Sequence, residues 1–243
     1  YYIVTFDKSP RQGRIVIDGS EYYALPVVLE WTPGSSHEVQ IPAEESGGEG
    51  IRYVFRNWSD ESTLTDRTIT ADVPGMIYVA RYDLEYRLAI YSDYGVTSGS
   101  GWYKPGTEVA ISVTPISLRD KESGVDFSFK GWVGSGTGQH YTGPTNPAGV
   151  VMTGAIEEYA QWEASMYYLE VVSPYGDPYG SGWYSPHSKA RFGVSTPVDQ
   201  GNDTLRVFLR WTGDLQAHQP EAEIVITRPV SYTHLRAHET VLD

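Results

Sequence analysis

The chain has 243 residues, of which 40% are hydrophobic, and it contains 19 Tyr and 7 Trp but only 3 Met. Its formal net charge of −13 argues against binding to nucleic acid or to anionic membrane surfaces, because both require basic patches. The absence of cysteine excludes disulfides and thiolate metal sites. Aromatic and β-branched residues favour strands, and 25 Gly and 15 Pro supply turns, so the composition predicts an all-β protein.

A first β module is predicted at residues 1–83. Residues 2–6 alternate as a strand, and Asp18-Gly19 lies between two apolar runs. This dipeptide predicts a type I′ hairpin, because both of its positions must adopt positive φ. A later strand ends at Trp58, which we expect to pack in the core.

A second module is predicted at residues 84–164 and a third at 165–228, because one stretch of sequence returns. Gly-Ser-Gly-Trp-Tyr occurs at 99–103 and again at 180–184, so that Trp102 and Trp183 are 81 positions apart. A period this long indicates whole small domains in tandem. Trp132 and Trp211 end corresponding strands and are expected to be core residues.

The fold class that follows is all-β, with three tandem β-sandwich or β-grasp-like modules of about 80 residues. The third module is expected to be truncated, because no counterpart of residues 158–162 follows it. Only a few residues, 82–86 and 162–168, connect successive modules. Such short connections predict closely packed neighbours and a semi-rigid rod.

Residues 229–243 resemble a translated sequencing adapter rather than a protein segment. The run from Val230 to Thr240 matches one reading frame of a common transposase-type adapter over 11 consecutive residues. We therefore expect a non-native tail, a metagenomic fragment as the source, and poor packing of the tail. The third module should then have an exposed edge, or an unfilled core position where a counterpart of Trp162 belongs. For the same reason His234 and His238, although spaced i, i+4, are not interpreted as a metal site.

The second module carries a pattern that resembles the divergent internalin-type B-repeats of bacterial and archaeal surface proteins. Its elements are Tyr86-x-Leu88-x-Ile90, Val109-x-Ile111-x-Val113-x-Pro115, Phe129-x-Gly131-Trp132-x-Gly134 and Tyr159-Ala-Gln-Trp162. The third module shares most of this pattern but has Leu209-Arg-Trp211 in place of Phe-x-Gly-Trp. Residues 2–41 are also similar to PEGA-type surface domains, although the tetrapeptide that names that family is absent.

These resemblances imply small extracellular modules that act as spacers, stalks or adhesive segments of long surface proteins. They bring no catalytic residues and no cofactor, and we find no catalytic constellation in the sequence. The leading hypothesis is a non-enzymatic, secreted or cell-surface repeat region whose partners are the neighbouring repeats of the same chain. It carries no membrane span. The alternative is an accessory module of a surface enzyme that binds a cell-surface glycan or protein.

The candidate binding residues of that alternative are aromatic side chains in Gly-rich turns, because exposed rings can stack on sugars. They are Trp102, Tyr103, Tyr179, Trp183 and Tyr184, and Tyr91, Tyr94 and Tyr175 would complete such an aromatic platform. The competing interpretation is that these rings pack the turns down, which the repetition of the stretch favours. The loop 199–203 offers several oxygens to calcium but lacks the EF-hand spacing, so a solvated turn is the preferred interpretation and no metal site is predicted.

Overall fold

The computed structural model of the chain describes residues 1–201, 204–214, 216–234 and 238–241. Their secondary structure is strand, turn and bend without helix, which confirms the predicted all-β class and is consistent with its β-sandwich alternative. In this part of the chain, no helix has the length and apolar character needed to cross a membrane.

The chain divides into two compact units. The first comprises Tyr1–Tyr91, Thr97–Ser112 and Trp132–Tyr159, and the second comprises Ser92–Val96, Val113–Gly131 and Ala160–Asp243. Residues 84–164, predicted as one module, therefore contribute to both units. The division into three modules, at residues 1–83, 84–164 and 165–228, stays a prediction.

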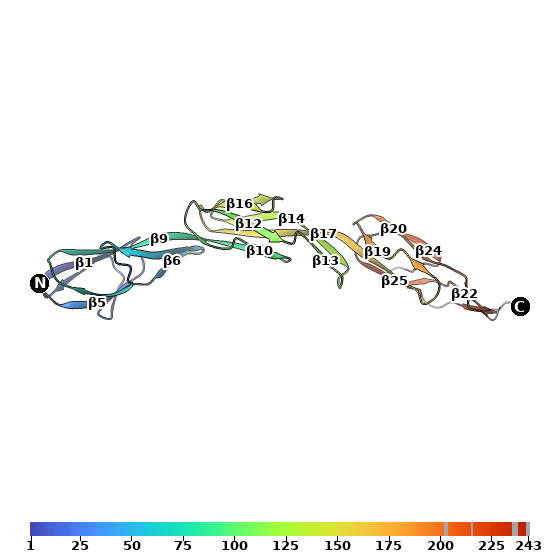
Figure 1. The fold of residues 1–243 in the computed structure, drawn as a ribbon, viewed down its shortest axis with the longest axis horizontal. Coiled ribbons are helices and arrows are strands. Elements are labelled where there is room, and N and C mark those ends of the chain that lie inside the picture. Colours follow the sequence, from blue (N-terminus) through green and yellow to red (C-terminus); the bar gives the residue numbers. More distant parts are fainter. Residues whose placement is uncertain (202–203, 215, 235–237, 242–243) are drawn as a thin grey trace. The chain divides into compact units, whose positions relative to one another are not determined.

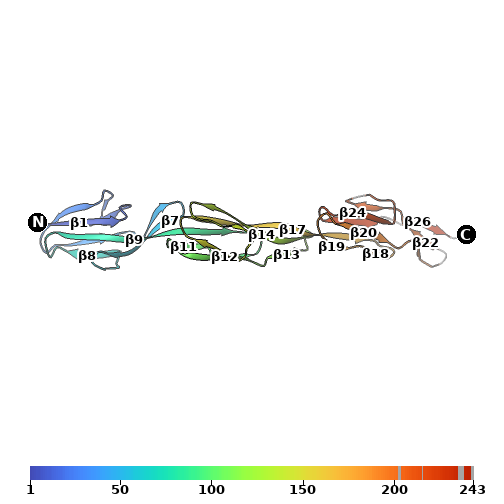
Figure 2. The same ribbon diagram turned by 90° about the horizontal axis from the view of Figure 1, so that it is seen from above.

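The first unit begins with β1 (Tyr2–Ser9), β2 (Ile15–Ile17), β3 (Ser20–Tyr22), β4 (Val27–Trp31), β5 (Ser36–Gln40), β6 (Glu44–Gly48), β7 (Ile51–Trp58), β8 (Asp66–Thr70) and β9 (Met76–Tyr91). β4, β1, β9, β7 and β6 are neighbours in one sheet, and β3, β2, β5 and β8 form another. Figures 1 and 2 show β1 in one layer and β5 and β8 in the other. The predicted hairpin at Asp18-Gly19 is confirmed, with φ values of 48° and 78° between β2 and β3.

The core of this sandwich follows from the period-two pattern of its strands. Val4, Phe6 and Lys8 on β1 point inward, while the residues between them are more exposed. Phe6 lies 5.6 Å from Trp31 and 6.4 Å from Trp58, measured between ring centroids. Trp58 is fully buried, as predicted, and so are Trp132 and Trp211.

The remaining strands are β10 (Val96–Ser98), β11 (Gly101–Tyr103), β12 (Glu108–Thr114), β13 (Ser117–Asp120), β14 (Val125–Gly136), β15 (Thr142–Gly143), β16 (Ala148–Val151), β17 (Ile156–Val172), β18 (Pro178–Tyr179), β19 (Gly182–Tyr184), β20 (Lys189–Val194), β21 (Val198–Asp199), β22 (Thr204–Val207), β23 (Trp211–Gly213), β24 (Glu221–Val225), β25 (Val230–His234) and β26 (His238–Val241). The boundaries of the compact units cross β10, β12, β14 and β17.

The long strand β9 joins the first two modules inside the first unit without a loop. Its residues 76–81 pair in parallel with β1, and residues 80–86 pair with β7. Its end pairs antiparallel with β11 and, over Leu88–Tyr91, in parallel with Ile156–Tyr159 of β17. The same strand therefore belongs to the sheet of both modules, which agrees with the expectation of a short connection.

The second unit has a core of its own, and the residues after Arg228 take part in it. Val230–Thr233 pair in parallel with β17, and β25 also pairs with β23. Tyr232 is only 2% exposed and stacks on Phe192 at 4.4 Å between centroids. The prediction of a poorly packed tail and an exposed edge is wrong here, because Val230 and Tyr232 supply the alternation that a strand requires. The position in register with Trp162 is 236, which lies outside the described residues.

Candidate functional site

The first Gly-Ser-Gly-Trp-Tyr stretch forms a short strand on the edge of β9. Trp102 pairs with Arg87 and Tyr103 with Tyr86 in the antiparallel register of β11 and β9. The Tyr103 hydroxyl donates to the Gly99 carbonyl at 2.8 Å, which closes the turn. Gly99 has φ of 113°, and a Cβ there would lie 2.6 Å from the Ala110 carbonyl oxygen. The turn therefore requires glycine, and the tyrosine holds it.

The second stretch repeats these contacts in the second unit. Trp183 pairs with Tyr168 in the register of β19 and β17. The Tyr184 hydroxyl donates to the Gly180 carbonyl at 2.8 Å, and Gly180 has φ of 98°. The two stretches are thus the same structural element, and Tyr103 and Tyr184 have a turn-closing hydrogen bond each.

Each of the two tryptophans lies against an arginine of the preceding module. The guanidinium carbon of Arg52 is 4.6 Å from the centroid of the Trp102 ring, and that of Arg119 is 4.6 Å from the Trp183 ring. Both indoles are half-buried. A guanidinium over an indole face at this distance forms a cation–π contact that stabilises by about 0.5–2 kcal/mol, depending on desolvation. One face of each ring is therefore occupied within the chain.

The two arginines come from β-hairpins that carry them on opposite strands. Arg52 lies on β7, the second strand of the β6–β7 hairpin, and its guanidinium bonds Glu85 at 2.8–2.9 Å. Arg119 lies on β13, the first strand of the β13–β14 hairpin. It forms a bidentate ion pair with Asp126, with hydrogen bonds of 2.8–3.1 Å. A carboxylate orients the guanidinium in both cases. Different strands thus produce the same contact.

The tips of the two hairpins also dock in the same way. The Gly50 carbonyl accepts the Arg87 amide at 2.9 Å, and the Gly124 carbonyl accepts the Tyr168 amide at 2.8 Å. Both glycines have positive φ, of 66° and 70°. A Cβ on Gly50 would lie 2.5 Å from the Ala155 Cβ, so the tip approaches the next module closely.

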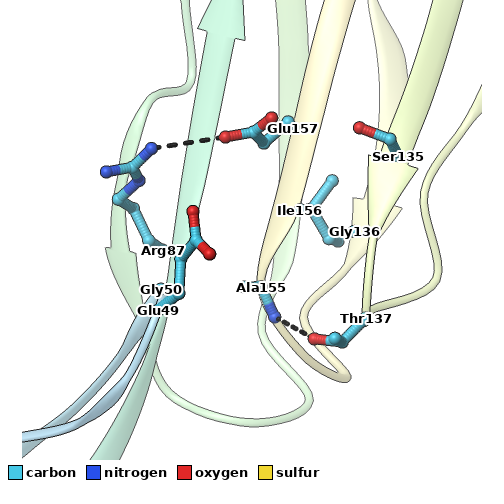
Figure 3. A pocket seen from close by; sticks show the side chains of 9 residues that line it. All are labelled: Glu49, Gly50, Arg87, Ser135, Gly136, Thr137, Ala155, Ile156 and Glu157. Carbon is cyan, nitrogen blue, oxygen red and sulfur yellow. Dashed lines mark hydrogen bonds and ion pairs between the residues drawn. The ribbon is translucent and has the colours of Figure 1, made fainter.

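A pocket of about 290 Å³ lies where the first tip meets β17 (Figure 3). Its lining residues are Glu49, Gly50, Arg87, Ser135, Gly136, Thr137, Ala155, Ile156 and Glu157. Arg87 and Glu157 face each other across it at 3.4 Å, and the Thr137 hydroxyl accepts the Ala155 amide at 3.1 Å. The pocket is as small as the smallest typical ligand sites, and much of its polar lining is internally paired.

Tyr179, the fifth candidate residue, lies apart from the Gly-Trp-Tyr strands. It is on β18, which pairs with β20, and its ring lies over Gly193, where a Cβ would be 2.5 Å from the tyrosine oxygen. A hydrogen bond with Glu221 raises the pKa of Tyr179. Trp183 and Tyr184 belong to the sheet of β17, so the structure does not place all the candidate rings on one strand or sheet.

Exposed aromatic stacking occurs between Tyr91, one of the residues expected to complete the aromatic platform, and Tyr159, which was not among the candidates. The rings of Tyr91 and Tyr159 stack at 4.9 Å and 22°, and the residues are 41% and 39% exposed. The Tyr159 hydroxyl donates to Glu157 at 2.9 Å, beside the pocket. The sequence signal for this pair was the outward position of both residues on alternating strands.

Glu158 is a buried carboxylate that sequence reasoning missed. It is 0% exposed, and its Oε1 accepts the Tyr141 amide at 2.6 Å. Its Oε2 has no hydrogen-bond partner in the described chain. Burial raises the pKa of Glu158, while the Tyr141 amide and the charge of His140 act in the opposite direction. The inward alternation of Ile156, Glu158 and Ala160 could have revealed it.

Because its pKa is raised in the fold, Glu158 stabilises the folded protein most below its ordinary pKa of 4.5. This stability is lost as the pH rises through the folded-state pKa, by about 1.4 kcal/mol for each tenfold difference between the acid dissociation constants of the folded and unfolded states. We expect Glu158→Gln to flatten this part of the stability–pH curve, measured by denaturant unfolding between pH 4 and 8. Glu157→Gln, on the exposed face of the same strand, is the control. Equal slopes for the wild type and Glu158→Gln would contradict this account.

Within the described ranges, no group of three or more His, Asp or Glu residues is arranged to hold a metal ion. The calcium candidate at 199–203 includes residues 202 and 203, which lie outside those ranges. Comparison of the chain with family models, with curated proteins and with solved structures gives no match. The resemblance to B-repeats and PEGA-type domains therefore stays a prediction.

Proposed function

We propose that this chain is a non-enzymatic repeat region of a large cell-surface protein and acts outside the cell as a stalk or spacer. The observation that supports this most is the repeated junction between successive modules. At each junction a hairpin tip accepts an amide hydrogen bond from the next module, and an arginine covers its tryptophan. Two junctions built alike are what a spacer made of tandem modules requires.

The continuity of the backbone at the first junction adds to this support. β9 has 16 residues and hydrogen-bonds with strands of both modules. At about 3.3 Å for each residue, such a strand spans roughly 50 Å. A paired strand cannot bend freely as a Gly/Ser linker does, because bending would break ladder hydrogen bonds. The junction therefore favours a fixed angle between the first two modules.

The first test of this function is Arg52→Ala. Without the guanidinium, the Trp102 ring and Glu85 lose their shared partner, so we expect a loss of about 0.5–2 kcal/mol at the junction and a broader angle between the modules. Spin labels at cysteines introduced for Ser20 and Thr145, both exposed, would report the distance distribution by pulsed electron resonance. The chain has no cysteine of its own, so the labels are unique.

Arg52→Lys is the matched control, because it keeps the charge but loses the planar stacking on the indole. We expect a distribution between those of the wild type and Arg52→Ala. A wild-type distribution as broad as that of Arg52→Ala would contradict the spacer proposal, since the junction would then be flexible in any case.

A second function, glycan or protein binding, is favoured by one observation. The stacked pair of Tyr91 and Tyr159 exposes aromatic surface beside Arg87 and Glu157. Rings flanked by charged hydrogen-bonding groups are a common arrangement for sugar recognition. Binding of the chain to a glycan array would favour this function, and loss of that binding in Tyr91→Ala but not in Trp183→Ala would assign it to these rings rather than to the arginine-covered tryptophans.

A further inference from the structure

The first module has a face that corresponds to the docking faces of the second and third. The correspondence rests on strand register. Val4 has Leu29 as its antiparallel neighbour and Met76 as its parallel neighbour. Leu88 has Gly101 and Ile156 in these two places, and Leu169 has Gly182 and Val230. Val4, Leu88 and Leu169 are therefore equivalent positions of three sheets.

This register assigns a counterpart to each residue that receives a hairpin. Ile3 corresponds to Arg87 and Tyr168, whose amides bond the glycine at the hairpin tip. Glu30 pairs with Ile3 and so corresponds to Trp102 and Trp183, the rings that the arginines cover. Ile77 corresponds to Glu157 and Ser231 beside the tips.

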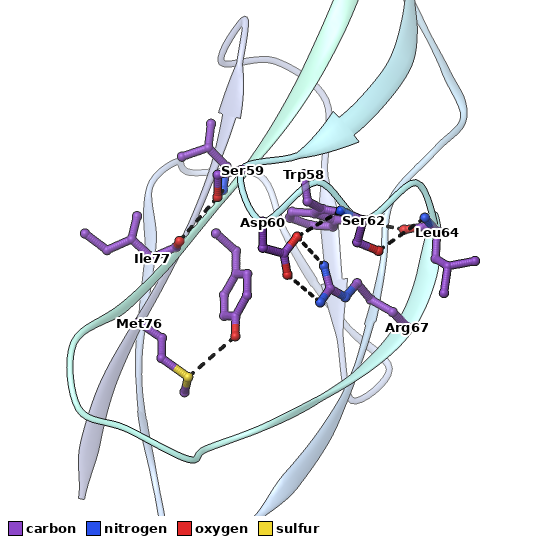
Figure 4. A network of polar contacts seen from close by, with 10 residues as sticks. Trp58, Ser59, Asp60, Ser62, Leu64, Arg67, Met76 and Ile77 are labelled. Carbon is purple, nitrogen blue, oxygen red and sulfur yellow. Dashed lines mark hydrogen bonds and ion pairs between the residues drawn. The ribbon is translucent and has the colours of Figure 1, made fainter.

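In the first module these positions are exposed and largely apolar. Together with Tyr1, which lies two residues before Ile3, we call them the end face, which consists of Tyr1, Ile3, Glu30 and Ile77. Ile3 is 44% exposed, Ile77 is 64% exposed and Tyr1 is more than half exposed. Figure 4 shows the Ile77 side chain pointing away from the polar network of Trp58, Asp60 and Arg67. The end face therefore has no covering hairpin among the described residues, although its equivalents have one.

Hydrogen bonds hold the backbone segments that carry the end face and the loops next to them. Arg67 holds Asp60 through two hydrogen bonds of 2.6 and 2.9 Å. The Ser59 hydroxyl contacts the Ile77 carbonyl at 3.4 Å and accepts the Val79 amide at 3.0 Å. The Gly75 amide donates to the Ile3 carbonyl at 3.1 Å, which ties the loop before β9 to β1. The backbone at Ile3 and around Ile77 is therefore held in place by hydrogen bonds.

We propose that the end face docks the β-hairpin of a further module of this kind, supplied by a preceding part of the same polypeptide. This inference rests on the proposed function, because it assumes a series of modules. In both junctions the hairpin comes from the module that precedes the docking face, so the same direction is expected here. A carboxylate at Glu30, where the other faces have an indole, fits the arginine that both docked hairpins present. Tyr1, Ile3 and Ile77 would exclude water from that ion pair.

The test is to lengthen the chain by a copy of residues 84–165 placed directly before Tyr1, which keeps the register of the second junction. The copy of Arg119 should then face Glu30. Hydroxyl-radical footprinting with mass spectrometry would measure oxidation of Ile3 and Ile77, and we expect it to fall several-fold on lengthening. Glu30→Arg should restore fast oxidation, and adding Arg119→Glu in the copy should slow it again. Oxidation that is unchanged by lengthening, or insensitive to Glu30→Arg, would overturn the proposal.

A second measurement needs no added module. A cyclised peptide with the sequence of residues 117–126 would be titrated into the original chain. We expect shifts of the Ile3 and Ile77 methyl signals, and none in Glu30→Arg; an absence of shifts in the original chain would overturn the proposal even if the lengthened chain failed to fold. The outcome is separate from that of the spacer test, which uses the junction at Arg52 and Trp102.

Discussion

Replacing Trp58 by alanine is expected to lower the free energy of unfolding of the first compact unit by about 3–5 kcal/mol. The indole is 0% exposed and packs edge-on against Phe6 and Phe55, with centroids 6.4 and 6.1 Å away. Its Nε1 donates to the Leu64 carbonyl at 2.9 Å. The substitution therefore leaves a cavity and also removes the hydrogen-bond donor to a carbonyl in the following loop. Chemical denaturation followed by circular dichroism would measure the loss.

One further variant separates the cavity from the lost hydrogen bond, and another compares this core tryptophan with a junction tryptophan. Trp58→Phe keeps most of the volume but removes the hydrogen bond, so a smaller loss is expected. Trp102→Ala removes an indole that is only half-buried and touches Arg52, and we expect a loss of about 1 kcal/mol. Equal losses for Trp58→Ala and Trp102→Ala would contradict the distinction between a core tryptophan and a junction tryptophan.

Local signals in the sequence predicted the features that depend on neighbouring residues. Asp18-Gly19 predicted its hairpin because the turn type needs positive φ at both positions, and both have it. Trp58, Trp132 and Trp211 were assigned to the core because each ends an alternating apolar strand, and each is buried. The all-β class followed from the same alternation.

The junction contacts could not be predicted in this way, because they join residues far apart in the chain. Arg52 and Trp102 are separated by β8, the long strand β9 and β10, and the equivalent arginine of the second junction is on the other strand of its hairpin. No fixed spacing therefore marks the pair. Tyr232 illustrates the opposite error, since the resemblance of its segment to an adapter outweighed a strand pattern that the fold uses.

The Gly-Ser-Gly-Trp-Tyr stretch gains a specific meaning from these contacts. Its glycine makes the turn, its tyrosine closes the turn by a hydrogen bond, and its tryptophan receives an arginine from the module before. The repetition is explained by a repeated junction. The sequence alone left structure and binding open for this stretch, because an aromatic ring beside glycine serves either purpose.

The first unit contains a buried ion pair, and we expect its disruption to lower the free energy of unfolding strongly. The Lys8 side chain is 0% exposed on the core face of β1 and pairs with Glu45 on β6. Its Nζ lies 4.7 Å from the centroid of the Tyr82 ring. Burial lowers the pKa of Lys8, while Glu45 acts in the opposite direction. The ammonium therefore depends on this carboxylate as its compensating charge.

Glu45→Ala is expected to cost about 3–5 kcal/mol at neutral pH, because it leaves the ammonium buried without its partner. In this variant the pKa of Lys8 should fall further below its ordinary 10.5. The folded state then binds fewer protons than the unfolded state, so stability should rise as the pH rises between these two pKa values. Urea unfolding at pH 6 to 10 would show the loss shrinking toward alkaline pH. Lys8→Met combined with Glu45→Leu removes both charges and should recover most of the stability. A double variant as unstable as Glu45→Ala would mean that the carboxylate acts by packing β6 onto β1 and not by compensating a buried charge.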